Sequence, residues 1–109
     1  MKHVIKTGLD FQNTKYAFDE AFKVYKQQYA EYNPQFGWKS DDLAKFAFKV
    51  KGFNIDGLVL IDGGDIVIDM TVPLIARAFQ GKAIEMIEKE VRVWVDRVKR
   101  TTSAQSNNS

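Results

Sequence analysis

Few residues in this chain of 109 have side chains suited to catalysis. His3 is the only histidine, and a general base needs a partner and a pocket to hold it. A position so close to the start of the sequence guarantees neither, so we expect His3 to be an exposed strand residue. With one histidine and no cysteine, a metal site built from these ligands is excluded.

Three aspartates, Asp62, Asp65 and Asp69, lie around the pair Gly63-Gly64. Calcium loops also space aspartates closely, but the alternating ligand pattern and the distal glutamate of such a loop are missing. Tight strand reversals need positive φ angles, which glycine adopts at low cost. The pattern therefore predicts a hairpin turn here, and we expect no metal.

Asp41 and Asp42 stand close to Trp38, a combination that could suggest the paired carboxylates of a glycosidase. Adjacent residues on a strand point to opposite faces, however, so these two cannot flank one bond. No nucleophile elbow, P-loop or dinucleotide-binding glycine motif occurs elsewhere. We therefore expect a protein that is not an enzyme and has no cofactor.

Composition sets further limits. An apolar fraction of 45% is ample for a core, so the chain is expected to form one domain over residues 1–100. A net charge of +2 is too balanced to favour nucleic acid. No apolar run approaches the roughly 20 residues that span a bilayer, and the first residues lack a signal-peptide core. We expect a cytoplasmic protein with no transmembrane segment, and a disordered polar tail at 101–109.

Hydrophobic periodicity assigns the elements. A short first strand over Lys2–Leu9 precedes a helix whose apolar stripe includes Phe18, Phe22 and Tyr25, and Asn33-Pro34 ends that helix. The period then changes to two over four short segments separated by turns, which predicts an antiparallel meander. The expected fold class is α+β, in the order β-α-β-β-β-β-α.

The last segment carries the longest apolar stripe. Ile84, Ile87, Val91, Trp94 and Val98 recur at steps of three and four, so they share one helical face. We expect a long C-terminal helix that starts near Pro73 and packs on the sheet. Glycine disfavours a helix interior, so we also expect a kink, or a second helix start, at Gly81.

Two interpretations of the apolar side chains stay open. They form the core, or the last helix and a curved sheet enclose a cavity for an apolar ligand. Leu58, Leu60 and Val67 point to the sheet face opposite the core, where an apolar strip indicates a second layer or a homodimer contact. The candidate ligand or surface contacts are Trp38, Phe46, Phe48, Leu58, Leu60, Phe79 and Trp94.

The order of the central and C-terminal segments resembles that of the polyhydroxyalkanoic acid system proteins, small proteins associated with polyester storage granules. The residues that carry the resemblance are Gly37-Trp38, Asp42, Phe46, Phe48, Ile55-Asp56-Gly57, Val72-Pro73, Phe79 and Ile84–Ile87. The family tends to have a His-x-Leu-Gly-like segment before its first helix, and this chain has Lys6-Thr7-Gly8-Leu9 there. A role tied to that histidine therefore does not carry over.

The resemblance implies a bacterial cytoplasmic protein of polyhydroxyalkanoate metabolism, with no established catalytic residue. Our leading hypothesis is a non-enzymatic accessory protein that associates with storage granules or their proteins. The alternative is a carrier of an apolar small ligand of the fatty acyl type, held between the C-terminal helix and the sheet. A hydrolase or isomerase of polyester precursors is a third hypothesis, for which the sequence offers no catalytic set.

Overall fold

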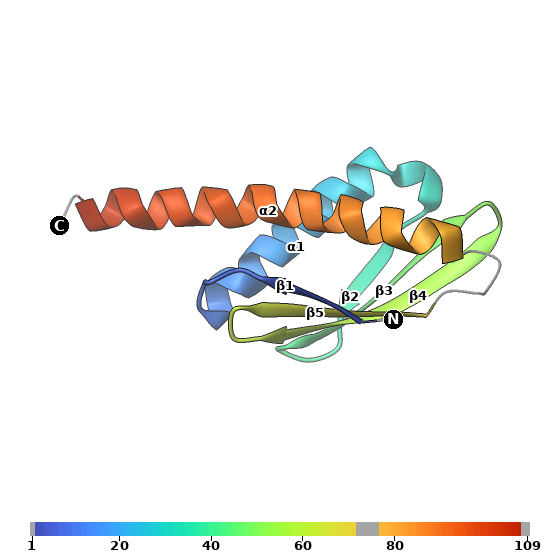
Figure 1. Ribbon diagram of the computed structural model, residues 1–109, viewed down its shortest axis with the longest axis horizontal. Helices are drawn as coiled ribbons and strands as arrows, with labels where there is room; N and C mark the ends of the chain where they lie inside the picture. Colours follow the sequence, from blue (N-terminus) through green and yellow to red (C-terminus); the bar gives the residue numbers. More distant parts are fainter. Residues whose placement is uncertain (1, 72–76, 108–109) are drawn as a thin grey trace.

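The structure, a computed structural model, describes residues 2–71 and 77–107, with the side chains of residues 2–71, 77 and 81–101. The described residues form five strands and two long helices, arranged as in Figure 1. In chain order the elements are β1 (Lys2–Lys6), α1 (Phe11–Gln28), the short 3₁₀ helix η1 (Ala30–Tyr32), β2 (Gln35–Trp38), β3 (Leu43–Val50), β4 (Phe53–Asp62), β5 (Asp65–Thr71) and α2 (Arg77–Asn107). The α+β class and the element order are confirmed.

All strand pairs are antiparallel, and the sheet order is β1-β5-β4-β3-β2. Strands β2 to β5 form the predicted meander. The first strand adds to the free edge of β5, where Val4 lies opposite Val67. Positive φ angles at Lys51 and Gly52, and at Gly63, allow the tight reversals before and after β4.

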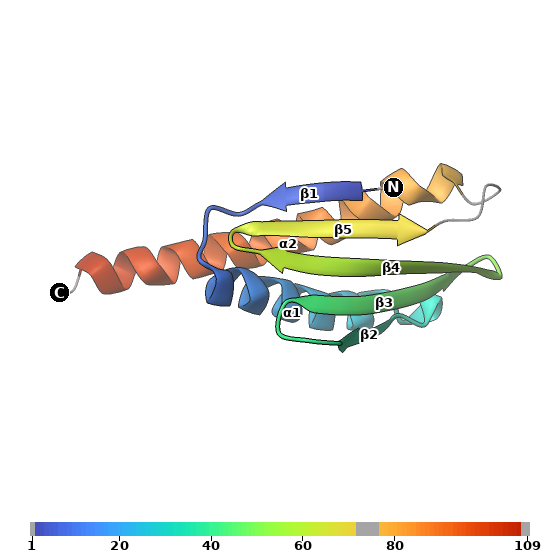
Figure 2. The same cartoon turned by 90° about the horizontal axis from the view of Figure 1, so that it is seen from below.

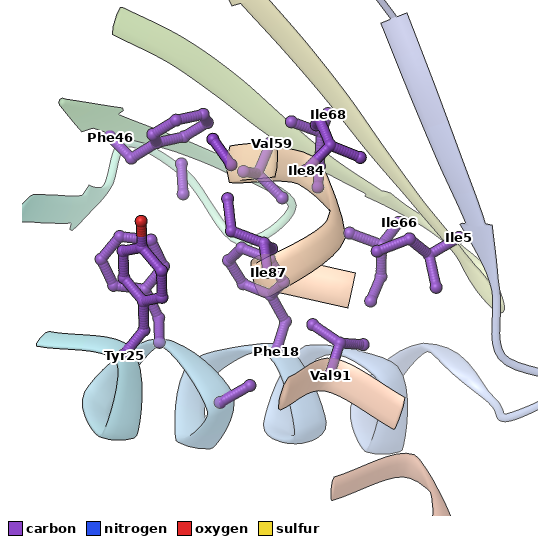
Figure 3. Close-up of a cluster of buried hydrophobic side chains, with 14 of the residues drawn as sticks. Ile5, Phe18, Tyr25, Phe46, Val59, Ile66, Ile68, Ile84, Ile87 and Val91 are labelled. Atoms are coloured by element: carbon purple, nitrogen blue, oxygen red, sulfur yellow. The ribbon is translucent and has the colours of Figure 1, made fainter. Parts of the chain in front are cut away.

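Both long helices cover the same face of the sheet, and among the described residues no helix lies on the other face (Figures 1 and 2). The core fills the space between the two layers. Figure 3 shows Phe18 and Tyr25 rising from α1 and Ile87 and Val91 coming from α2, all facing the inward side chains of the strands. The strands supply the other half of the core, because every second side chain along a strand points toward the helices.

Helix α1 begins where Asp10 accepts a hydrogen bond from the backbone N–H of Asn13, at 2.8 Å. This hydrogen bond stabilises one of the free N–H groups of the first turn. The helix ends at Gln28, ahead of the expected end at Asn33-Pro34. A short 3₁₀ turn follows, and Asn33 then takes a left-handed conformation with φ 48°.

Helix α2 is a single helix that runs without interruption past Gly81. The predicted break at this glycine is therefore absent. Gly81 is exposed, and nothing lies within 4 Å of the place where a Cβ would stand. The expected start at proline 73 falls outside the described residues. At the other end the helix reaches Asn107, whereas the sequence predicts a disordered tail from residue 101. Helix propagation adds one backbone hydrogen bond for each residue, which favours continuation of a helix that has already formed.

The buried stripe of α2 differs from the prediction at one position. Ile84, Ile87, Val91 and Val98 are buried as expected, but Val95 is also fully buried. Trp94 lies at the edge of the stripe and is half-buried. A helix has 3.6 residues per turn, so position 95, four residues after Val91, lies closer to the direction of Val91 than position 94 does, and Val95 joins the buried stripe.

A buried polar pair fixes the loop between β1 and α1. The hydroxyls of Thr7 and Thr14 lie 3.1 Å apart, and Thr7 Oγ1 also donates to the carbonyl of Gly64 at 2.7 Å. The backbone N–H of Leu9 donates to Thr7 Oγ1, and Thr14 Oγ1 donates to the carbonyl of Asp10. These bonds connect the start of α1 to the β4–β5 hairpin, and they satisfy groups that would otherwise be costly to bury.

Candidate functional site

The helix-free face of the sheet carries a continuous apolar row. It crosses four neighbouring strands, β1, β5, β4 and β3, and each of its residues pairs with the next in the register. The residues, in that order, are Val4, Val67, Leu60 and Leu43. Because they share the outward direction of the pleat, the four side chains form one band across the sheet. We call this band, together with Leu58 beside it, the apolar row.

The side chains of the apolar row are accessible. Val4 is 45% exposed, Leu58 46% and Leu60 38%, while Val67 and Leu43 are half-buried between their neighbours. The expected outward direction of Leu58, Leu60 and Val67 is therefore confirmed. Single exposed apolar residues are normal, but a connected set across four strands is a feature that needs an explanation.

Charged residues surround the apolar row on both sides. The strand residues that share its direction and carry charge are Lys2, Lys6, Lys45, Lys49, Asp56, Asp62, Asp65 and Asp69. Four lysines and four aspartates leave this face with no net charge. A face of this kind does not attract the phosphates of nucleic acid, which require an excess of basic residues.

Phe46 and Phe48 belong to the core. They are 1% and 3% exposed, and their rings stack at 6.1 Å on the helix side of β3. The ring of Phe46 lies over Gly57 of the neighbouring strand, its partner in the register. Neither ring can reach a partner at the surface, although Phe48 contributes to the wall of a pocket described below.

Trp38 packs against the core at the β2 edge of the sheet. It is half-buried, and its indole N–H donates to Asp19 Oδ1 of α1 at 3.0 Å. The ammonium of Lys15 lies 4.6 Å from the centre of the Trp38 ring, within the range of a cation–π contact. These contacts tie β2 to α1, so Trp38 has a structural role in the free protein.

Trp94 packs at the edge of the α1–α2 interface. Tyr16 meets it edge to face with ring centroids 6.4 Å apart, and the Arg97 guanidinium lies 4.6 Å from its ring. The indole N–H of Trp94 is buried and finds no hydrogen-bond partner within the described residues. The side chain of Phe79, the remaining candidate, lies outside the described set.

His3 is not the exposed residue that the sequence predicts. Its Nε2 lies 2.6 Å from Glu88 Oε1 of α2. Arg92 joins the same group, with Nη2 at 3.4 Å from Glu88 and Nη1 donating to the carbonyl of Lys6 at 2.7 Å. The hydrogen bond from His3, together with the charge of Arg92, holds the pKa of the Glu88 carboxyl below its usual range. The cluster connects β1 to α2.

Two open spaces lined by described residues lie beside α2. A pocket of about 140 Å³ lies between η1, the end of β3 and the start of α2, and Tyr25, Phe48 and Met86 contribute to its wall. A more polar groove of about 290 Å³ lies on the other side of Met86, between α2 and the end of α1. The interior between the two helices is nearly filled, with about 10 Å³ left near Phe18.

In the described part of the chain, no group of three or more metal-ligating side chains comes together, and no helix is long and apolar enough to cross a membrane. Comparison of the chain with protein-family models, curated proteins and solved structures finds no match. The resemblance to the polyhydroxyalkanoic acid system proteins therefore depends on the sequence pattern alone, and it stays a prediction. The geometry that supports a function is the apolar row.

Proposed function

We propose that this protein is a non-enzymatic accessory protein of polyhydroxyalkanoate storage, which associates with the polyester granule through the apolar row. The observation that supports the proposal is the connected band of Val4, Val67, Leu60 and Leu43 on the face without helices. Contact with an apolar surface removes these side chains from water, which is favourable by roughly 25 cal/mol for each Å² of apolar area.

The charges around the apolar row favour a neutral apolar partner. The equal numbers of lysines and aspartates give no net attraction to a strongly charged surface, and they keep the rim of the face hydrated. A polyester surface presents alkyl groups and ester carbonyls without charge. The proposal places the protein in the cytoplasm, as the resemblance implies.

Two other occupants of the apolar row give different results in the same experiment. A second copy of the chain would cover the row in a homodimer, and a granule protein would cover it in a heteromeric complex. The carrier of an apolar ligand stays a second candidate function, and the pocket of about 140 Å³ beside α2 favours it for a short ligand.

Co-sedimentation with isolated granules tests the proposal. The purified protein is mixed with granules that have been stripped of protein, and with untreated granules, and both are pelleted. We expect the protein in both pellets. Binding only to untreated granules would identify a granule protein as the partner. A protein that stays in the supernatant in both cases, as a monomer or as a dimer, contradicts the proposal.

A further inference from the structure

The pocket between η1, β3 and α2 is built on the helix side of the sheet, away from the apolar row. Its wall includes the rings of Tyr25, Tyr32 and Phe48, and its floor includes Val50 and Ala83, which are buried. The remaining lining residues are Lys51, Lys82 and Met86. Aromatic and aliphatic groups therefore surround the space, and ionisable side chains stand at its rim.

The volume of the pocket limits the size of a ligand that it can hold. At about 140 Å³ it is far larger than the roughly 10–15 Å³ that one water molecule needs, and it is similar to the engineered cavity of about 150 Å³ that binds benzene. A single six-membered ring or a short branched chain fits such a space. The interior next to it, near Phe18 and Ile87, leaves only about 10 Å³, so the described pocket does not continue as a tunnel for a long acyl chain.

Tyr25, one of the lining residues, carries a hydrogen-bond donor. Figure 3 shows the Tyr25 side chain rising from α1 with its hydroxyl directed toward the sheet. No hydrogen bond of this hydroxyl is found within the described residues. Burial, together with the neighbouring Tyr29 and Tyr32, raises the pKa of Tyr25 to about 12. The hydroxyl therefore keeps its proton near neutral pH and can donate to an oxygen of a ligand.

The charged side chains of the lining have one sign. Lys51 and Lys82 are both exposed at the rim, and none of the described lining residues has a carboxylate. The adjoining groove differs, because Glu85 and Glu90 lie there beside Lys89. An anionic group is therefore favoured at the mouth of the pocket and not in the groove.

We propose that this pocket binds a small carboxylate with a compact apolar body, with its ring or branched chain against Phe48 and Ala83 and its carboxylate beside Lys82. Tyr25 donates a hydrogen bond to the ligand from the inner wall. The inference is independent of granule association, because it concerns the opposite side of the sheet and different residues.

Benzoate is a suitable probe, since it combines one ring with one carboxylate, and benzamide is its neutral counterpart. Each is titrated into the full chain, and the methyl resonances of Ala83, Val50 and Met86 are followed by NMR. We expect saturable shifts of these methyl groups with benzoate, with a dissociation constant of about 1 mM or tighter for so small a ligand. Benzamide is expected to bind roughly three- to tenfold more weakly.

Variants separate the roles of charge and space. Lys82→Gln should weaken benzoate to the level of benzamide and leave benzamide unchanged, whereas Lys89→Gln, an exposed lysine of the same helix outside the lining, should change neither. Ala83→Leu fills the pocket and should remove binding of both. Because Ala83 is 7% exposed, that variant is used only if the core methyl resonances keep their wild-type positions, and Lys82→Gln decides the test otherwise.

Three results would overturn the inference. The first is the absence of saturable shifts at the pocket methyl groups up to about 10 mM benzoate, well above the expected dissociation constant. The second is equal binding of benzoate and benzamide by the wild-type protein. The third is a benzoate effect confined to the apolar row, at the methyl groups of Val4 and Leu60.

Discussion

The ring of Phe46 occupies the space in which a side chain at position 57 would begin. Phe46 and Gly57 lie opposite each other in the β3–β4 pair, and a Cβ built on Gly57 would stand 2.2 Å from Phe46 Cζ. Phe46 in turn packs against Phe22 of α1 with ring centroids 6.3 Å apart. The glycine thus lets the sheet accept a large ring between itself and the helix layer.

Gly57→Ala should therefore destabilise the fold. The added methyl group conflicts with the Phe46 ring and lies 3.0 Å from the carbonyl of Asp69, and a ring that is 1% exposed has no room to move away. We expect a loss of about 1–3 kcal/mol in the free energy of unfolding, measured by urea denaturation.

Gly37→Ala is the matched control, because Gly37 is exposed on β2 and nothing lies within 4 Å of its Cβ position. It should change stability by less than about 0.5 kcal/mol. Equal effects of the two substitutions would show that Gly57 is not required for the close approach of Phe46.

The buried pair Thr7 and Thr14 gives a second prediction. Thr7→Val keeps the shape of the side chain, but it leaves the N–H of Leu9 without its acceptor and removes the hydroxyl that donates to the carbonyl of Gly64. The expected cost is about 1–3 kcal/mol in thermal or urea unfolding. The double variant with Thr14→Val should cost less than the sum of the single changes, because both act on one network.

Strict additivity in that cycle would mean that the two hydroxyls contribute independently. Thr71→Val serves as the control for the change of hydroxyl to methyl, since Thr71 is exposed at the end of β5. It should leave the free energy of unfolding nearly unchanged.

The lowered pKa of Glu88 predicts that the stability of the fold depends on pH in the acid range. Its pKa is lowered in the folded state, first by the hydrogen bond from His3, so the folded protein binds this proton more weakly than the unfolded chain does. The stabilising contribution is complete above the unfolded value of 4.5, and it is lost as the pH falls from there through the lowered folded pKa.

The measurement compares the wild type with Glu88→Gln over the acid range. The difference in unfolding free energy between them should shrink as the pH falls below about 4.5. Glu85→Gln, an exposed position of the same helix, is the control. A difference for Glu88→Gln that grows on acidification would contradict the assigned contact.

The raised pKa of Tyr25 predicts that its hydroxyl loses its proton only at strongly alkaline pH. Its pKa is raised to about 12 by burial, so the folded protein holds this proton more tightly than the unfolded chain. The associated stability is complete below the usual tyrosine value of about 10 and is lost as the pH rises toward 12. In an ultraviolet titration of the folded protein, Tyr25→Phe should remove one late-titrating tyrosine. Removal of an early component instead would place the Tyr25 hydroxyl in water.

The sequence pattern was sufficient for most of the local structure. The change to a period of two predicted the meander of β2 to β5, and the turn chemistry of Gly63 and Gly64 located the hairpin. The outward direction of Leu58 and Leu60 also followed from alternation. These features depend on near neighbours along the chain, which a single sequence contains.

Features that depend on distant parts of the chain were missed. The addition of β1 to β5 brings His3 to Glu88, and nothing local to either residue signals the contact. The uninterrupted helix at Gly81 is another case, because the cost of one glycine is small beside the burial of Ile84 and Ile87 in the following turn. The pocket beside α2 likewise depends on how η1 meets the start of that helix.

The most direct test of the central claim is the affinity of the protein for protein-free polyhydroxybutyrate particles, measured by sedimentation for the wild type and for Leu58→Ser combined with Leu60→Ser. The side chains are exposed, so the variant should fold, and loss of about 1 kcal/mol of contact from each should weaken binding roughly tenfold or more. Val93→Ser, an exposed apolar position on α2, should bind like the wild type. Equal binding by the Leu58/Leu60 variant, or a wild-type protein that does not sediment with the particles, would contradict the account.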